Sequence, residues 1–316
     1  MSGPNALQVL AGYSPDDRGE DALALAALVT RGAGASLAVA HVHPPPWPAH
    51  GPGRVDAEWV AYLRSQADEA LAQAAERLGG LAVPRERVTV RAHPHRGSGR
   101  GLAEVAREVG AGLIVIGSAP RGRRGRIAIG STADQLLHGS PVPVMLAPRG
   151  YAGHAPGRLE RLTIAYWRRR DVAGPLLAAA EFAGTLGLPM RLVTLVLRPP
   201  GLAARFQTAG GVLERQVAQA DEDLREAAGF LGGGAPVERL TSVGTGIDKA
   251  LGTVDMLPGE VLACHSSHDA PLRRVFLGES SGKIVRAAPC PVLVLPRGAG
   301  PAAAGAAGPP GGESPG

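Results

Sequence analysis

Short apolar runs alternate along the chain with longer stretches in which apolar residues recur every three or four positions. In the first half, the apolar runs occupy residues 6–13, 36–42, 87–92, 113–116 and 142–146. The amphipathic stretches between them cover residues 16–31, 56–78, 97–109 and 133–138. Short unalternated apolar runs are typical of strands buried on both faces, whereas a period of 3.6 residues predicts helices. Strands that alternate with helices predict right-handed crossovers and a parallel sheet covered by helices on both faces.

The same pattern restarts after residues 150–157, a Gly- and Ala-rich segment that we interpret as a linker. The second-half strands are predicted at residues 159–166, 191–196, 237–242, 261–264 and 291–295, and the helices at 172–186, 212–231, 246–255 and 278–288. This internal repeat predicts an α/β fold with two tandem doubly wound five-stranded parallel sheets, each in the order 3-2-1-4-5. We expect domains at residues 1–149 and 158–297. Residues 298–316 are expected to form a disordered tail, because their Gly, Ala and Pro bury too little apolar surface.

Composition narrows the class of protein. A chain of 316 residues is long enough for two domains, and its net charge is only +5. Apart from Lys249 and Lys283 the basic residues are arginines, which are scattered, and only 3% of residues are aromatic, so we do not expect a nucleic-acid partner. The sequence contains no apolar run of 18 residues and no signal-peptide pattern, which predicts a cytoplasmic protein without a membrane partner. Cys264 and Cys290 are expected to be reduced structural residues.

Residues 113–147 carry the strongest candidate chemistry. A buried strand at 113–116 stops at Gly117, and an Arg- and Gly-rich loop leads to Gly130-Ser131-Thr132 at the start of a helix. We expect Ser131 or Thr132 to cap this helix. A glycine at a strand end and free amides at a helix start predict a site for an anion. In a doubly wound sheet that site lies at the switch point between the first and fourth strands.

From Gly117 to Gly130 the sequence reads Gly-x2-Pro-x9-Gly-Ser, which resembles the Gly-x2-Gly-x9-Gly-[Ser/Thr] nucleotide loop of the universal stress protein family. The strand Pro-Val-Pro-Val-Met-Leu-Ala at 141–147 is similar to the closing strand of that family. The resemblance covers residues 6–297. It implies a cytoplasmic stress-response regulator, not an enzyme, that binds ATP or a related adenine nucleotide in its first domain. It also implies a pseudo-twofold pair of domains whose fifth strands face each other, and it leaves open whether chains form a homodimer.

The resemblance implies nucleotide-binding residues at Ser14, Val42, Ile116, Gly117, Pro120, Gly130, Ser131 and Thr132. Two of these positions depart from the family. Ser14 stands where nucleotide-binding members have an Asp that meets the adenosine, so it brings no charge. Pro120 replaces the second loop glycine, which forbids positive φ and removes a backbone donor. Arg121, Arg123, Arg124 and Arg126 either compensate by pairing with a polyphosphate or form a solvated loop.

The second half departs further from the nucleotide-binding pattern. The Asp position falls on Trp167, which is expected to fill the adenosine pocket. The loop glycines become His265, His268 and Gly278, and the Ser becomes Glu279, whose carboxylate would repel a phosphate and satisfy the helix start itself. We therefore predict a degenerate second domain that does not bind ATP. The rival hypothesis is that neither half binds nucleotide and that the protein is a tandem scaffold or interaction module.

Overall fold

The structure is a computed structural model that describes residues 7–45, 54–167, 173–198, 208–231, 237–266, 275 and 277–296; the predicted tail and His268 lie outside the described residues. The first half contains, in order, β1 (Gln8–Gly12), α1 (Asp17–Ala33), β2 (Ser36–His43), α2 (Arg54–Gly79), η1 (Arg85–Arg87), β3 (Val88–Pro94), α3 (Ser98–Glu108), β4 (Leu113–Gly117), α4 (Ser131–Leu137) and β5 (Val144–Ala147). After η2 (Tyr151–His154), the second half contains β6 (Arg161–Ala165), α5 (Ala173–Leu186), β7 (Met190–Leu197), α6 (Thr208–Phe230), β8 (Glu238–Gly244), α7 (Ile247–Gly252), β9 (Glu260–His265), α8 (Glu279–Ala287) and β10 (Val292–Leu295).

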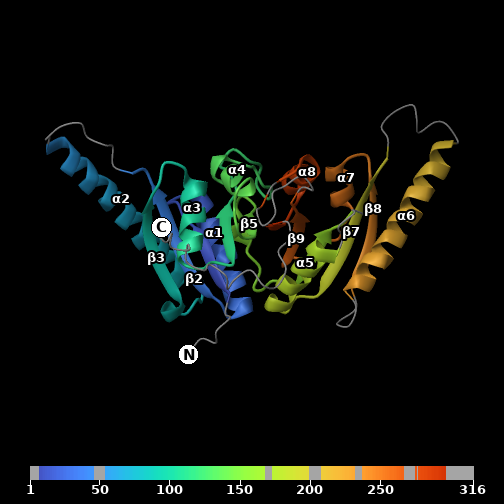
Figure 1. The fold of residues 1–316 in the computed structure, drawn as a ribbon, viewed down its shortest axis with the longest axis horizontal. Helices are drawn as coiled ribbons and strands as arrows, with labels where there is room; N and C mark the ends of the chain where they lie inside the picture. The colour runs from blue at the N-terminus through green and yellow to red at the C-terminus, as the bar shows by residue number, and fades with distance from the viewer. Residues whose placement is uncertain are drawn as a thin grey trace, which may run out of the picture.

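The strands form one sheet in the order β3-β2-β1-β4-β5-β10-β9-β6-β7-β8 (Figure 1). Each half has the predicted order 3-2-1-4-5 with parallel pairing, so the predicted fold class is confirmed. The two five-stranded sheets are continuous, because β5 and β10 pair antiparallel with Leu146 opposite Val292 and Val144 opposite Val294. Both strands are short and completely buried, and their pairing leaves neither half with an open apolar edge there.

Helices cover the sheet in two layers that run across both halves. One buried cluster joins α1, α2, α5 and α6 to one face of the sheet, and the other joins α3, α4, α7 and α8 to the opposite face. Strands such as β4 and β9 are buried along nearly their whole length, which explains their unalternated apolar sequences. The long helices α2 and α6 lie at the two outer ends of the sheet (Figure 1). None of the helices in the described segments is long and apolar enough to cross a membrane.

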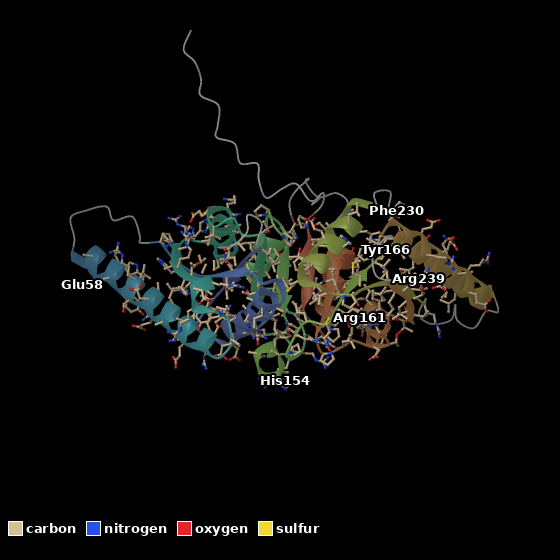
Figure 2. The ribbon with its side chains drawn as sticks, turned by 90° about the horizontal axis from the view of Figure 1, so that it is seen from below. Glu58, His154, Arg161, Tyr166, Phe230 and Arg239 are labelled. Carbon is tan, nitrogen blue, oxygen red and sulfur yellow. The ribbon has the colours of Figure 1, made fainter. Side chains whose placement is uncertain are left out.

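Residues 150–157, which we interpreted as a linker, are attached to the first helix. The Asp21 carboxylate on α1 is only 2% exposed and accepts hydrogen bonds from the amides of Gly150 and Ala152, each at 2.8 Å. Burial raises the pKa of this carboxyl, and the two amide hydrogen bonds partly oppose that rise. Tyr151 is buried beside the helix, whereas His154 lies at the surface (Figure 2). The segment between the halves therefore packs on the first half.

Candidate functional site

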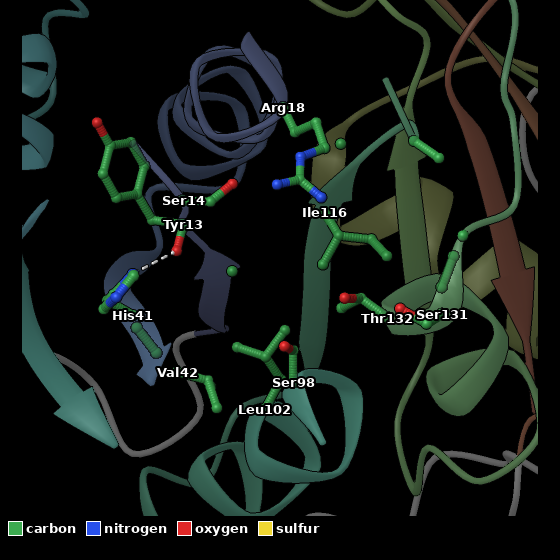
Figure 3. Close-up of a pocket in the computed structure, with 16 residues that line it drawn as sticks. Tyr13, Ser14, Arg18, His41, Val42, Ser98, Leu102, Ile116, Ser131 and Thr132 are labelled. Carbon is green, nitrogen blue, oxygen red and sulfur yellow. Dashed lines mark hydrogen bonds between the residues drawn. The ribbon is translucent and has the colours of Figure 1, made fainter. Parts of the chain in front are cut away.

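A cleft opens at the carboxyl ends of β1 and β4, at the switch point of the first-half sheet (Figure 3). Its solvent-accessible volume is about 140 Å³. The loop after β1, the end of β2, the first turns of α1, α3 and α4, and the end of β4 all contribute to its walls. The lining residues are Gly12, Tyr13, Ser14, Arg18, Ala40, His41, Val42, Ser98, Leu102, Ile116, Gly117, Ala119, Gly130, Ser131, Thr132 and Ala133.

Seven of the eight residues implied by the resemblance line this cleft. They come from four separate segments, and they are Ser14, Val42, Ile116, Gly117, Gly130, Ser131 and Thr132. The topology therefore brings together positions that are up to 118 residues apart in the sequence. Three of the other lining residues, Arg18, Ser98 and Leu102, were not found from the sequence. They belong to elements next to the motif, and no residue pattern within those elements distinguished them.

Pro120 is the exception, and its assignment to the site stays a prediction. It is exposed on the loop between β4 and α4 and does not line the cleft. The loop is closed at its base, beside the cleft, because the Ala119 amide donates to the Ala128 carbonyl at 3.0 Å and the Ala128 amide donates to Ser118 Oγ at 2.8 Å. Pro120 lies in the part of the loop that extends away from the cleft beyond these hydrogen bonds. This part of the loop requires neither a positive φ nor a backbone donor at residue 120, so the proline leaves the cleft open.

The four loop arginines also stay outside the cleft lining. Beyond the closure, the loop is bound to the segment after β5. The Gly125 amide donates to the Arg149 carbonyl at 2.9 Å, and Arg149 Nη1 donates to the Gly122 carbonyl at 2.7 Å. These bonds direct Arg121, Arg123 and Arg124 to the exposed surface. In this structure the loop arginines do not provide the compensating charge that we considered from the sequence.

Gly117 is required by packing as well as by the cleft. A Cβ atom built at this position would lie 2.2 Å from the carbonyl oxygen of Arg18, in the first turn of α1. The contact is with backbone, so it cannot be relieved by a side-chain rotation. The end of β4 therefore approaches the backbone at the start of α1 more closely than any side chain at residue 117 would allow.

We expect Gly117→Ala to lower the free energy of unfolding by about 1–3 kcal/mol, because backbone must move to accept the methyl group. Gly184→Ala in α5 is the matched control, since a Cβ there meets nothing within 4 Å. That substitution is expected to stabilise the protein by about 0.5–1 kcal/mol, because alanine loses less backbone entropy in a helix. Urea unfolding of both variants measures the difference, and equal effects would contradict the close-approach argument.

The start of α4 differs from the prediction. The cap residue is Gly130, the helix begins at Ser131, and no side-chain cap is formed by the described residues. Ser131 and Thr132 therefore do not cap the helix. Both residues line the cleft, so their hydroxyls are available to a ligand bound there. The amides of the first helical turn have no acceptor within the helix, so they are available to an anion or to water.

Tyr13 and His41 form the wall on the β1–β2 side. His41 Nδ1 lies 3.1 Å from the Tyr13 carbonyl oxygen (Figure 3), and it must be the donor because a carbonyl only accepts. Burial lowers the pKa of His41 below its ordinary value of 6.5, and nearby His43 lowers it further, while the bond to Tyr13 acts in the opposite direction. His41 is therefore a neutral donor in the cleft at neutral pH.

This shift predicts a pH dependence. The unfolded chain binds a proton at His41 at a higher pH than the folded chain, so stability is present above pH 6.5 and is lost as the pH falls through the folded pKa. His41→Asn should remove this contribution. We expect the stability difference between the wild type and the variant to change only below about pH 6.5, and the NMR titration midpoint of His41 to lie below that of an unfolded histidine. A midpoint above 6.5 would contradict the burial effect.

The Ser14 hydroxyl is already engaged. It donates to Asp16 Oδ1 at 2.8 Å, and Asp16 itself is not among the lining residues. No carboxylate is present among the described residues that line the cleft, whereas Arg18 contributes a guanidinium. The site therefore offers neutral donors and one positive charge to a ligand.

The corresponding cleft of the second half is apolar. Its described lining consists of Ala165, Tyr166, Trp167, Val193, Leu195, Leu197, Ile247, Ser280 and Ile284. Trp167 lies on the wall but does not fill the cleft as we expected, because a solvent-accessible volume of about 190 Å³ remains. Gly278 and Glu279 do not line the cleft. Among the described lining residues, Ser280 is the one with a short polar side chain, so these walls offer few hydrogen-bond donors to a phosphate.

Glu279 corrects one further expectation. Its carboxylate does not cap α8, for which the described residues form no side-chain cap. It pairs instead with Lys283 one turn later, at 2.7 Å, and its side chain is 83% exposed. The hydrogen bond to Lys283 lowers the pKa of Glu279. An i,i+4 partner in the same helix is easier to reach than the helix start, so the carboxylate turns toward solvent.

Comparison with known proteins agrees with this arrangement of two similar halves. The sequence profile described as the universal stress protein family matches residues 7–148 and 175–296. This chain belongs to the universal stress protein family. A universal stress protein of Mycobacterium tuberculosis (strain ATCC 25618 / H37Rv) is 37% identical over 297 residues, which cover 92% of this chain and 100% of the relative. A universal stress protein of Mycobacterium bovis shows the same identity and coverage.

Solved structures show the same fold. A universal stress protein from Archaeoglobus fulgidus has a TM-score of 0.59 at 17% identity and covers 92% of this chain and 98% of its own. A protein of unknown function from Pseudomonas aeruginosa PAO1 has a TM-score of 0.53 at 15% identity and covers 92% of each chain. Each of these two structures aligns with both halves of this universal stress protein.

Proposed function

We propose that this universal stress protein is a cytoplasmic stress-response regulator that binds ATP or a related adenine nucleotide in its first-half cleft. One observation carries the proposal: four distant segments, chosen by resemblance to the nucleotide loop, line a single cleft at the switch point. In this arrangement, the phosphates contact the first-turn amides of α4 and the hydroxyls of Ser131 and Thr132. The apolar side chains of Val42, Leu102 and Ile116 provide a surface for the adenosine.

The second half serves as a structural partner in this proposal. Its cleft presents Trp167, Leu195, Leu197 and Ile247 to a ligand, and its described lining has no positive charge. Transfer of a phosphate to such apolar walls would leave its charge unpaired, which is costly. The exclusion of nucleotide therefore follows from the apolar walls more than from the Glu279 carboxylate, which Lys283 already pairs.

We also propose that the bound nucleotide is a regulatory ligand and not a substrate. A general base for hydrolysis must reach the attacking water, and the described cleft lining contains no Asp, Glu or Lys. The neutral His41 donates its Nδ1 proton to the Tyr13 carbonyl, which leaves Nε2 as its one unprotonated ring nitrogen. Any turnover should therefore be slow relative to binding.

A thermal-shift series on the full chain with ATP, ADP, AMP and adenosine tests this proposal. A ligand that binds only the folded state stabilises it by RT ln(1 + [L]/Kd), about 2.7 kcal/mol at 100 times Kd. We expect a rise in Tm with adenine nucleotides and a smaller one with inorganic phosphate. The engagement of Ser14 with Asp16 favours the rival scaffold hypothesis. The absence of any shift at millimolar nucleotide would support that rival.

A further inference from the structure

Arg18 is the charged side chain of the first-half cleft. It is the one Lys, Arg, Asp or Glu among the described lining residues. It belongs to the first turn of α1, and its guanidinium extends into the cleft toward Ile116 (Figure 3). Its side chain is 43% exposed, so solvent and ligands can reach it. A guanidinium presents several donors in a planar fork that matches phosphate oxygens.

In the unliganded cleft this fork is directed to Asp16. Arg18 Nε lies 2.9 Å from Asp16 Oδ2 and 3.2 Å from Oδ1, and Nη2 lies 2.5 Å from Oδ2. Burial raises the pKa of Asp16, but the hydrogen bonds from Arg18 and Ser14 outweigh burial and lower it overall. The bond to Asp16 in turn raises the pKa of Arg18. Both groups are therefore charged, and the pair is intact at physiological pH.

Asp16 has other partners that would remain if Arg18 turned away. As the cap of α1 it accepts from the Arg18 amide at 3.0 Å and the Gly19 amide at 3.4 Å. It also accepts from Ser14 Oγ at 2.8 Å. An exposed ion pair gains little from its own Coulomb energy. A phosphate carries more charge than a carboxylate, so the exchange of Asp16 for a phosphate favours the liganded cleft.

We propose that Arg18 is the phosphate-binding cation of the cleft and that Asp16 competes with the ligand for it. The ligand class that this geometry selects is a phosphorylated adenine nucleotide over the uncharged nucleoside. The inference rests on the proposed function, since it assigns a residue within the same cleft. Release of Asp16 from Arg18 accompanies binding, and the other partners of Asp16 keep the start of α1 in place.

Two substitutions should change affinity in opposite directions. Arg18→Gln removes the cation, and we expect AMP to bind about tenfold or more weakly, while adenosine binding changes by less than about twofold. Asp16→Asn retains a good helix cap but removes the competing charge. We expect it to strengthen AMP binding by about threefold, with adenosine again unchanged. In the double variant, Asp16→Asn should bring no gain, because the cation that it would release is absent.

Calorimetry of AMP and adenosine on the full chain tests the proposal, with Tm measured for each variant. Arg77→Gln is the matched control. Arg77 lies on α2 and pairs with Glu20, which lies on α1 like Arg18, so the substitution removes an exposed ion pair of α1 away from the cleft lining. Equal loss of AMP and adenosine in Arg18→Gln, or no gain in the folded Asp16→Asn variant, would overturn the role of Arg18 while leaving nucleotide binding intact. Binding of neither ligand by the wild type would overturn the proposed function together with this inference.

Discussion

Replacement of Glu260 by glutamine is expected to lower the free energy of unfolding by about 3–5 kcal/mol, because it leaves the buried Arg191 with only the half-exposed carboxylate of Glu238, 3.6 Å away, as counter-charge. Glu260 is fully buried at the start of β9. Arg191 on β7 is only 2% exposed and donates from Nη2 to Glu260 Oε1 at 3.0 Å. Arg161 at the start of β6 donates from Nη2 to Oε2 at 2.8 Å, and Thr163 also donates to the carboxylate.

A glutamine at 260 has the same shape but presents an amide to these donors. Two guanidinium groups would then share one neutral side-chain acceptor at position 260, and the longer contact of Arg191 with Glu238 would offset less of its desolvation cost. Urea or thermal unfolding measures the loss. Because the network joins β6, β7 and β9 at their amino ends, opposite the ends that form clefts, nucleotide affinity in the first half should be unchanged.

Glu238→Gln is the matched control for Glu260. Glu238 pairs with the same two arginines, with Arg161 at 2.8 Å and with Arg191 at 3.6 Å, but its side chain is 51% exposed. Solvent screens both contacts, and Glu260 remains to pair with both arginines, so the control should cost less than about 1 kcal/mol. A loss below 1 kcal/mol for Glu260→Gln as well would show that the buried network contributes no more than a surface pair. Arg161 can be followed in the second half in Figure 2.

Gly130→Glu is expected to weaken nucleotide binding by about tenfold to a hundredfold or more. The substitution places a carboxylate at the cleft wall beside the first-turn amides of α4, where the proposed phosphates lie. Repulsion between like charges in a partly desolvated site costs about 1–3 kcal/mol. The second half has its carboxylate one position later, because Glu279 aligns with Ser131 and Gly278 aligns with Gly130.

Gly130→Ala separates charge from shape. A Cβ at residue 130 lies 3.0 Å from the Ala119 Cβ, which requires only a small adjustment of the loop. Calorimetry with ATP should therefore show near wild-type affinity for Gly130→Ala and a large loss for Gly130→Glu. Similar losses in both variants would mean that any side chain at this position closes the cleft, and wild-type affinity in Gly130→Glu would place the phosphates elsewhere.

The sequence predicts the fold well because the apolar pattern is strong. The strand expected at 36–42 is found at Ser36–His43, and the helix expected at 172–186 begins one residue later. The joining of the halves into one sheet depends on the pairing of two distant edge strands. Local propensity contains no information on the partner of an edge strand, so only their facing arrangement could be expected.

The site could be predicted where function depends on the backbone path and not where it depends on side-chain rotamers. Gly117 and Gly130 reach the cleft because strand ends and helix starts fix their positions. The direction of Arg18 toward Asp16 and of Glu279 toward Lys283 is a choice among rotamers that only the folded chain decides. Glu260 and Arg191 flank apolar runs, so from the sequence they are typical of solvated strand ends, although the structure buries both.

We propose that one half of this tandem universal stress protein binds an adenine nucleotide and that the other does not. Isothermal titration of ATP into the full chain tests it most directly, because the number of sites per chain is measured together with affinity. We predict one site per chain, with an affinity about tenfold to a hundredfold or more lower in Gly130→Glu. Two sites per chain, or no binding by the wild type, would contradict the account.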